Sequence, residues 1–371
     1  MRKIVFILIL ILSACTTKPQ IEYPYEFPYQ PPVSIEYRAS LMMVGDALLH
    51  LAYVNDGRKA DGSYDFRPSL RYIAPIVRNY DLAFYNQETV FGGKELGYSN
   101  YPRFNSPSDF GEQMVEMGFN LVSLANNHTM DKGVRGALNS YNFWKNQPVN
   151  TAGSWGSQED RDLLRVHEIN GITYAFLAYT YSTNGISVPE NQKYIIDVYD
   201  EALIKKDMER YRDIVDFMIV SLHFGQEYSH TPQTRHKQMA TFVAQQGADI
   251  IIGHHPHVIQ PIDFIGDTLV IYSLGNFVSA QIGEPRLIEM IASVEMVKIV
   301  TSEKIYYRLE NVKADLLYNH YTSSYKQFTI YPMSKIPLTL LPNRDAKYLE
   351  YVSIITRLQP DRISIGGFFD E

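Results

Sequence analysis

The sequence predicts an α/β protein in which buried strands alternate with helices along most of the 371 residues. Three observations lead to this prediction. Apolar runs of strand length recur along the chain, segments with helical periodicity lie between several of them, and a polar motif follows most of the runs. Because the chain is long enough to bury a sizeable core, we expect one large domain over residues 36–315 and a C-terminal extension over residues 316–371.

The first residues are typical of an export signal rather than of a folded element. Two basic residues precede an unbroken apolar run, Ile4 to Leu12, which is shorter than the roughly 20 residues of a membrane-spanning helix. The next residues, Ser13-Ala14-Cys15, complete a segment that resembles a bacterial lipobox, cut before Cys15 and lipidated on its sulfur. We therefore expect residues 1–14 to be a lipoprotein signal peptide, the alternative being a signal peptide with an incidental cysteine.

This anchor would place the protein in the cell envelope, at the outer membrane or at the outer face of the cytoplasmic membrane. Residues 15–35 are rich in Pro and Tyr and are expected to form a semi-extended tether. Cys15 is the only cysteine, so a disulfide framework and a thiolate metal site are both excluded. The formal net charge of -7 and the lack of a basic run argue against nucleic-acid binding.

The elements follow from local patterns in chain order. The expected strands are apolar runs, at residues 37–44, 81–85, 119–125, 172–179, 216–222, 250–252 and 268–274. The expected helices have apolar residues at helical spacing, at residues 67–77, 109–117 and 234–246. Ser108 and Gly118 are suited to begin and end the second of these helices. Residues 286–315 alternate well enough to add strands, and residues 343–358 should form a closing helix.

Six polar motifs follow the predicted strands directly. They are Gly45-Asp46, Asn86-Gln87-Glu88, Asn126-Asn127-His128, the segment HFGQEY at 223–228, the segment GHHPHV at 253–258, and Gly275-Asn276-Phe277. In open α/β sheets, ligands bind beyond the carboxyl ends of the strands, so these motifs are expected to converge on one site.

The side chains that the motifs would bring together form a mixed oxygen and nitrogen donor set. It comprises two carboxylates, one amide oxygen and three imidazoles, from Asp46, Glu88, Asn127, His223, His255 and His257. Such a set suits Mn, Fe or Zn better than Ca or Mg. Six donors are too many for one tetrahedral ion. They suit two divalent ions about 3.5–4 Å apart that share a bridging carboxylate, as in two-metal hydrolases.

The motifs, in this order over residues 36–285, resemble the CapA/PgsA-type capsule and poly-γ-glutamate synthesis proteins. That family is distantly related to the calcineurin-like metallophosphoesterases. The resemblance rests above all on HFGQEY, on GADIIIGHHPHVIQP at 247–261 and on YSLGNF at 272–277, together with LANNHTMDKG at 124–133. It implies a four-layer α-β-β-α sandwich of the metallophosphoesterase type.

The resemblance also implies a role for each motif residue. Asp46 and His257 would bind one ion, Glu88 would bridge the two, and Asn127, His223 and His255 would complete the second. His128 corresponds to a family histidine that faces the substrate and protonates a leaving group. Asp131 would either orient His128 or serve as a turn or helix-cap residue.

Several positions leave alternatives open. Leu48 stands where the phosphoesterase pattern has a histidine; His50 could substitute for it or be a simple loop residue. The extra residue in GHHPH makes His254 an alternative to His255. Glu227 and Tyr228 could contact substrate or support the loop, and Asn276 could hold a ligand loop. Arg103 and Arg135 could receive an anionic group or lie on the solvated surface. The remaining histidines, His167, His230, His236 and His320, are expected at structural or surface positions.

Three functions are compatible with these features. The first is an enzyme, an envelope-anchored dimetal phosphoesterase-like hydrolase that acts on an anionic envelope polymer or phosphoester substrate in capsule or poly-γ-glutamate biosynthesis or export. The second is a non-catalytic assembly or export factor whose metal site is structural. Because the chain has no Gly-rich nucleotide-binding loop, a polymer ligase or exporter partner would have to supply any ATP-driven step. The third, suggested only by the 28 tyrosines and the tether, is a sugar- or peptidoglycan-binding lipoprotein.

Overall fold

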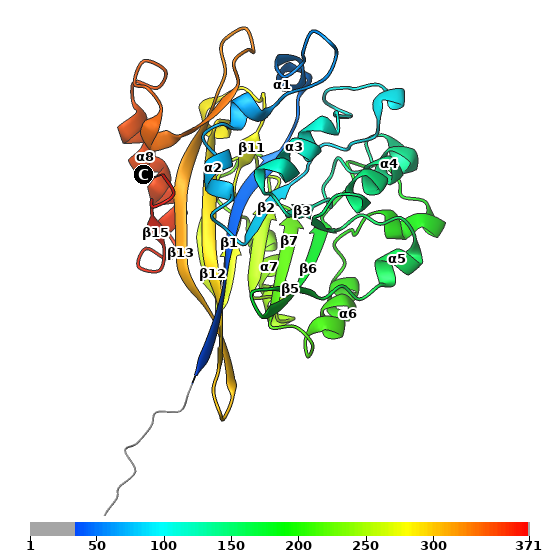
Figure 1. Ribbon diagram of the computed structural model, residues 1–371, viewed down its shortest axis with the longest axis vertical. Coiled ribbons are helices and arrows are strands. Elements are labelled where there is room, and N and C mark those ends of the chain that lie inside the picture. The colour runs from blue at the N-terminus through cyan, green and yellow to red at the C-terminus, as the bar shows by residue number, and fades with distance from the viewer. Residues whose placement is uncertain (1–33, 370–371) are drawn as a thin grey trace, which may run out of the picture.

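The structure, a computed structural model, describes residues 34–369 and contains two β-sheets packed face to face with helices on their outer faces (Figure 1). The predicted signal peptide, Cys15 and nearly all of the tether lie outside these residues. Across residues 34–369, no helix combines the length and the apolar character that a membrane crossing requires.

The larger sheet has nine strands and the smaller sheet has six. The larger sheet runs in the order β14 (Thr329–Pro332), β13 (Ile305–His320), β12 (Ile288–Val300), β1 (Ile35–Ala47), β2 (Leu82–Asn86), β3 (Leu121–Ser123) and β4 (Asn150–Ala152), with β11 (Asn276–Val278) paired to β1 and β15 (Ser364–Ile365) paired to β13. The smaller sheet runs in the order β5 (His167–Ile169), β6 (Ile172–Thr180), β7 (Phe217–His223), β8 (Ile250–His254), β10 (Thr268–Ile271) and β9 (Ile262–Ile265). Strands β1 to β4 are parallel, as are β6, β7, β8 and β10, so their carboxyl ends share one rim in each sheet.

Strand β1 shows why both faces of the larger sheet are buried. Leu41 and Met43 belong to the apolar cluster between the two sheets, and Met42 and Val44 belong to the cluster under the outer helices. Side chains alternate faces along a strand, so a continuous apolar run is what a sheet covered on both sides requires.

The helices complete four layers. The outer cluster of the larger sheet includes residues of α1 (Leu51–Asp56), α2 (Ala74–Val77), α3 (Asp109–Met117) and α4 (Gly133–Lys145). The outer cluster of the smaller sheet includes residues of α6 (Glu201–Tyr211) and α7 (Thr234–Gln245). The remaining helices are α5 (Gln158–Asp162) and α8 (Arg344–Thr356). The predicted α-β-β-α sandwich is therefore confirmed.

The helix predicted over residues 67–77 is wrong as a single element. The chain instead forms a short 3-10 helix, η1 (Arg67–Leu70), followed by the single turn of α2. Pro75 has no N–H, and its ring would clash with the carbonyl four residues earlier, so a helix cannot run through it. The strand expected over residues 119–125 is shortened to β3, because the chain turns toward the polar motif after Ser123.

The C-terminal residues are joined to the main sheet rather than set apart from it. The expected boundary at residue 315 falls inside β13, which pairs with β12 along nearly its whole length. Helix α8 lies where the closing helix is predicted, and its Tyr351 and Ile355 belong to the same apolar cluster as the residues between the sheets.

Gly45 is placed where the backbone after β10 approaches β1 most closely. A Cβ atom at this position would lie 2.0 Å from the carbonyl oxygen of Gly275. We expect Gly45→Ala to lower the free energy of unfolding by about 1–3 kcal/mol, measured by urea denaturation, because the contact can be relieved only by moving backbone. Gly62→Ala is the control for backbone strain without crowding: unlike Gly45, that glycine has a positive φ, and it has no neighbour within 4 Å. Equal losses in the two variants would contradict the close-approach argument.

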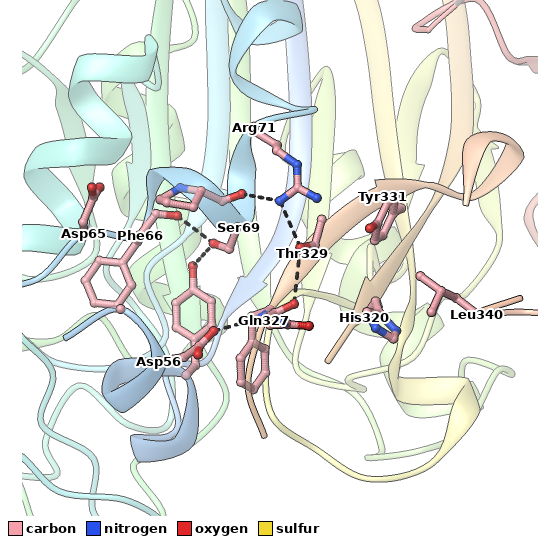
Figure 2. A pocket seen from close by; sticks show the side chains of 14 residues that line it. Asp56, Asp65, Phe66, Ser69, Arg71, His320, Gln327, Thr329, Tyr331 and Leu340 are labelled. Carbon is pink, nitrogen blue, oxygen red and sulfur yellow. Dashed lines mark hydrogen bonds between the residues drawn. The ribbon is translucent and has the colours of Figure 1, made fainter. Parts of the chain in front are cut away.

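A cavity of about 440 Å³ opens between η1 and β14 (Figure 2). Its polar groups are largely bound to the local chain: Arg71 Nη1 donates to the Pro68 carbonyl at 2.9 Å and to Thr329 Oγ1 at 3.2 Å. Asp56 accepts a hydrogen bond from the Phe328 amide at 2.9 Å. None of the six polar motifs contributes to its lining. The cavity is therefore lined by other parts of the fold, and the candidate metal ligands lie elsewhere.

Candidate metal centre

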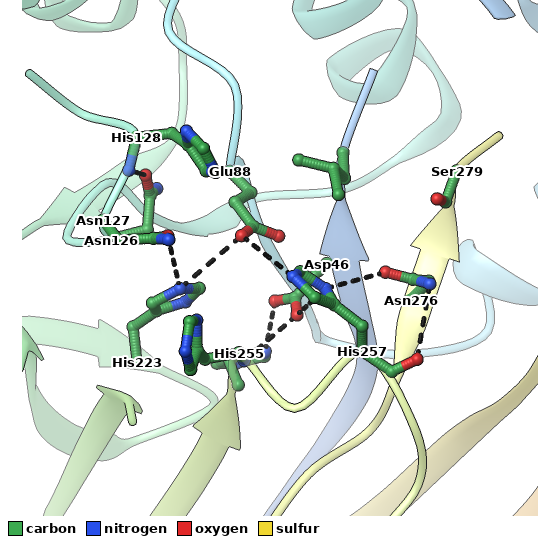
Figure 3. Close-up of polar contacts among 12 residues, drawn as sticks. Asp46, Glu88, Asn126, Asn127, His128, His223, His255, His257, Asn276 and Ser279 are labelled. Carbon is green, nitrogen blue, oxygen red and sulfur yellow. Dashed lines mark hydrogen bonds and ion pairs between the residues drawn. The ribbon is translucent and has the colours of Figure 1, made fainter. Parts of the chain in front are cut away.

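The polar motifs meet at the carboxyl ends of the parallel strands (Figure 3). Asp46 lies near the end of β1, His223 ends β7, and the other candidates lie in the loops that follow β2, β3 and β8. The six candidate ligands are each at most 3% exposed. Segments far apart in the sequence thus contribute to one buried cluster.

Glu88 lies at the centre of this cluster. Its Oε1 is 3.6 Å from His223 Nε2 and 3.7 Å from His257 Nε2. The donor atoms of Glu88, His255 and His257 lie within 4.8 Å of one another. One carboxylate therefore faces histidines from two different strand ends, as the bridging role expected of Glu88 requires.

Asp46 is surrounded by hydrogen-bond donors. Its Oδ1 accepts from Asn86 Nδ2 at 2.8 Å and its Oδ2 from the His255 backbone amide at 3.1 Å. Burial alone would raise the pKa of the Asp46 carboxyl, but the adjacent His254 and His257 hold it well below its usual range. Asp46 is thus kept as a carboxylate without solvent.

Asn127 and His223 face each other across the cluster. Asn127 Oδ1 lies 2.9 Å from His223 Nε2, while Asn127 Nδ2 donates to Asn184 Oδ1 at 3.2 Å. The contact with Asn184 fixes the amide orientation, so that Asn127 directs its oxygen toward the site.

His257 is oriented by Asn276, the first residue of β11. His257 Nδ1 lies 3.0 Å from Asn276 Oδ1 (Figure 3). Asn276 Nδ2 donates to the Arg286 carbonyl at 3.0 Å. With Nδ1 held as the donor, Nε2 is left as the nitrogen that faces Glu88, an arrangement typical of metal-binding histidines. Burial lowers the pKa of His257, but Glu88 and Asp46 raise it to about 9.

The structure separates the two adjacent histidines of the GHHPH segment. His255 belongs to the group with Glu88 and His257, and its Nε2 lies 3.2 Å from the Tyr181 hydroxyl. His254 ends β8 with its ring against that of Phe84, and its Nδ1 lies 3.1 Å from Asp46 Oδ1. This geometry favours His255 as the ligand and His254 as a support for Asp46.

The unsatisfied atoms at the site show that a divalent metal fits these residues. Among residues 34–369, neither carboxyl oxygen of Glu88 has a hydrogen-bond partner, nor does His255 Nδ1, although all three atoms are buried. Burial and the Asp46 carboxylate raise the pKa of Glu88 well above its usual range. Burial and the neighbouring His257 lower the pKa of His255 to about 3, so its imidazole is neutral and able to bind a metal. Buried polar atoms without any partner are rare unless a ligand satisfies them.

His128 is held by Asp131 at the edge of the cluster. His128 Nδ1 lies 2.8 Å from Asp131 Oδ2, which also accepts a hydrogen bond from the Phe104 amide at 2.6 Å. The Phe104 ring packs edge-on against the imidazole, with centroids 4.8 Å apart. Asp131 does not cap α4, whose N-cap residue is Lys132. Of the two interpretations of Asp131, the structure therefore favours the orienting one.

The remaining candidates lie around or away from the cluster. Burial lowers the pKa of His50 to about 4, and its Nδ1 lies 3.0 Å from the Leu48 carbonyl rather than among the ligands. The Arg135 side chain is 69% exposed, and Arg103 is exposed as well. The other histidines contact local structure: His167 packs on Tyr174, His230 faces the Ile259 carbonyl, His236 packs on Phe224, and His320 lines the cavity of Figure 2.

Sequence reasoning assigned no role to four residues that contact the cluster or lie beside it, Asn86, Tyr181, Asn184 and Arg286. A signal for Tyr181 was present, because it lies two residues after the apolar run at 172–179, which ends at the same rim as the other strands. Asn184 lies in a loop and Arg286 in a short 3-10 helix, Glu284–Arg286, and their contacts depend on how these connecting segments fold.

The fold and the cluster define a two-sheet α/β protein with a candidate metal site of carboxylate, amide and imidazole donors at the sheet rim. Residues 40–281 match the family described as bacterial capsule synthesis protein PGA_cap, and the chain belongs to that family.

Two similar proteins are also named for capsule or PGA biosynthesis. The chain is 31% identical over 250 residues to the PGA biosynthesis protein CapA of Bacillus subtilis strain 168, which covers 65% of this chain and 63% of that protein. It is 27% identical over 252 residues to the capsule biosynthesis protein CapA of Bacillus anthracis, covering 66% and 60%. The match thus spans less than two thirds of either relative's own length.

Solved structures with a similar arrangement are more distant. The NAD nucleotidase NadN of Haemophilus influenzae aligns with a TM-score of 0.44 at 13% identity, covering 89% of this chain and 57% of that one. A 5'-nucleotidase of Candida albicans aligns with a TM-score of 0.42 at 12% identity, covering 71% and 51%.

Proposed function

We propose that this protein acts in the biosynthesis or export of a capsule polymer of the poly-γ-glutamate type, through a two-metal, phosphoesterase-like hydrolase site. Family membership and the names of the two Bacillus relatives support the biological role. The observation that carries the chemical part is Glu88, a buried carboxylate without a hydrogen-bond partner that faces histidines from two strand ends.

In this proposal Glu88 would be shared by two metal sites, and the other candidate ligands would divide between them. Asp46 and His257 would hold one Mn, Fe or Zn ion, and Asn127, His223 and His255 would hold the other. Bound there, the pair would supply hydroxide near neutral pH and neutralise charge on the substrate oxygens.

The proton needed by a leaving group would come from His128. Asp131 accepts from Nδ1, so Nε2 is the ring atom free to exchange a proton with the substrate. The Phe104 ring restricts the imidazole to this orientation. Because Asp131 and Phe104 hold the ring already, little reorganisation is needed before the proton moves.

A second candidate function is a non-catalytic assembly or export factor with a structural metal site. The observation that favours it is Leu48, whose buried side chain stands where the phosphoesterase pattern has a histidine. His50, the possible substitute, faces main-chain groups instead. In either case a separate ligase or exporter partner would drive polymer formation and transport.

Metal analysis and an esterase assay test the proposal directly. Purified protein from residue 34 onward is expected to bind about two divalent ions, measured by mass spectrometry of the metal content, and to hydrolyse a generic phosphomonoester or phosphodiester. Two bound ions with no hydrolysis of any ester or polymer tested would favour the assembly factor. Failure to bind divalent metal would contradict both versions.

The envelope anchor is a separate part of the proposal. We expect Cys15→Ser to prevent lipidation and to move the folded protein from the membrane fraction to the soluble fraction, because one thiol carries the acyl anchor. Cell fractionation with immunodetection measures the shift. Co-fractionation of the Ser variant with membranes at the wild-type level would show that something other than Cys15 holds the protein there.

A further inference from the structure

Arg286 lies beside the candidate metal centre without a carboxylate partner. Its guanidinium carbon is 4.0 Å from the centroid of the Tyr228 ring, and that ring lies 6.2 Å from the His257 ring. One aromatic ring therefore separates the cation from a candidate ligand. Among residues 34–369, no Asp or Glu lies within ion-pair distance of Arg286, in contrast to most of the half-buried arginines.

Main-chain contacts tie both residues to the site. The Arg286 carbonyl accepts from Asn276 Nδ2, the amide whose oxygen faces His257. The Tyr228 amide donates to the Pro256 carbonyl at 2.8 Å, within the GHHPH segment. Arg286 Nη1 donates to the Ile282 carbonyl at 2.6 Å, which leaves its Nη2 and Nε without a partner in the described part of the chain.

The surroundings of this pair are open to a ligand. Tyr228 is 46% exposed, and Arg286 is half-buried. A guanidinium that is stacked on a ring and keeps free N–H groups is preorganised for a planar or tetrahedral oxyanion. The exposed Glu227 beside Tyr228 adds one negative charge, so the pair suits a single anionic group better than a dense cluster of charge.

We propose that Arg286, stacked on Tyr228, receives an anionic group of the substrate, a carboxylate or a phosphate, one ring away from the metal centre. This rests on the proposed function, since it assumes that the substrate reacts at that centre. It assigns to Arg286 the role considered above for Arg103 and Arg135, both of which are exposed.

Binding measurements with two probes test this assignment. Calorimetric titration of the metal-loaded protein would use a short γ-linked glutamate oligomer as the carboxylate source and inorganic phosphate as the phosphate source. Arg286→Gln is expected to weaken binding of one or both probes about tenfold, the order expected for a charge-assisted hydrogen bond. The probe that weakens identifies the group recognised.

Matched variants separate recognition from structure. Arg362 also stacks on an aromatic ring, that of Phe264 on β9, so Arg362→Gln should leave binding unchanged. Tyr228→Phe keeps the stacking ring and should bind as wild type, whereas Tyr228→Ala should approach the weakness of Arg286→Gln.

The assignment is overturned if Arg286→Gln binds both probes as wild type does, or if it loses metal together with binding, which would show a structural role through Asn276. These outcomes are independent of catalysis. Wild-type protein that binds a probe through Arg286 but hydrolyses nothing would refute the enzyme proposal alone, and an active Arg286→Gln variant with unchanged binding would refute the present inference alone.

Discussion

Glu88→Gln is expected to abolish tight metal binding while the metal-free protein stays folded. The amide has the shape of the carboxyl group but no negative charge, and Glu88 Oε1 lies 3.6 Å from His223 Nε2 and 3.7 Å from His257 Nε2. A ligand present at 100 times its Kd stabilises a protein by about 2.7 kcal/mol, and the variant should lose that increment for the ions Glu88 holds. The measurement is thermal unfolding of wild type and variant, each with and without added Mn²⁺ or Zn²⁺.

The metal-free proteins provide the internal comparison. Among residues 34–369 neither Glu88 oxygen has a hydrogen-bond partner, so the replacement removes no hydrogen bond and only the electrostatic contacts with His223 and His257. The two metal-free proteins should therefore unfold within about 1 kcal/mol of each other. Glu227→Gln removes an exposed carboxylate near the site and should respond to metal as wild type does. A metal response in Glu88→Gln equal to that of wild type would remove Glu88 from the ligand set.

His128→Ala is expected to lower kcat by about 10²–10⁴-fold without loss of metal, the usual contribution of a general acid. The reason is positional: Asp131 and Phe104 hold the ring at the edge of the cluster, and it has no ion-pair or hydrogen-bond contact with Glu88. Steady-state kinetics with an ester substrate and metal analysis of the same preparations measure the two effects.

Two further variants make the interpretation specific. Asp131→Asn keeps the shape of the side chain and should lower kcat less than His128→Ala, because it weakens the orientation of the ring without removing it. His320→Ala changes a histidine in the cavity of Figure 2 and should have wild-type kinetics. If His128→Ala lost metal to the extent that Glu88→Gln does, His128 would be a ligand rather than a proton donor.

The sequence alone predicts that the candidate ligands lie close together, because these residues come shortly after apolar runs of strand length. Asp46, Glu88, Asn127 and His223 each lie within three residues of the end of a predicted apolar run, and parallel strands bring their carboxyl ends together. The choice between His254 and His255 could not be made in this way. It depends on the left-handed backbone at His255, with φ of 96°, which turns one imidazole toward Glu88 and leaves its neighbour behind Asp46.

Elements that depend on tertiary contacts were harder to predict. Strand β4 has only three residues and no apolar run, and it forms because β3 offers it a parallel edge. The prediction of a single helix over residues 67–77 was wrong because it followed the helical spacing of the apolar residues and overlooked Pro75, which interrupts a helix. Arg286 begins the segment 286–315 that was predicted to add strands, but it lies in the short 3-10 helix Glu284–Arg286, and its contact with the Tyr228 ring could not be predicted from the local pattern.

The pairing of β1 with β12 has a consequence for how the chain folds as it is made. β1 lies near the start of the described chain, and its antiparallel neighbour comes only at residues 288–300, beyond the family-matched segment. At about 5–20 residues per second, a ribosome needs on the order of 10 to 50 s to produce the second strand after the first. Until β12 is made, the edge of β1 that pairs with β12 in the folded sheet has no strand beside it. We therefore expect slow, late folding for this chain and a need for chaperone protection of β1 during synthesis, because pairings between distant segments close last.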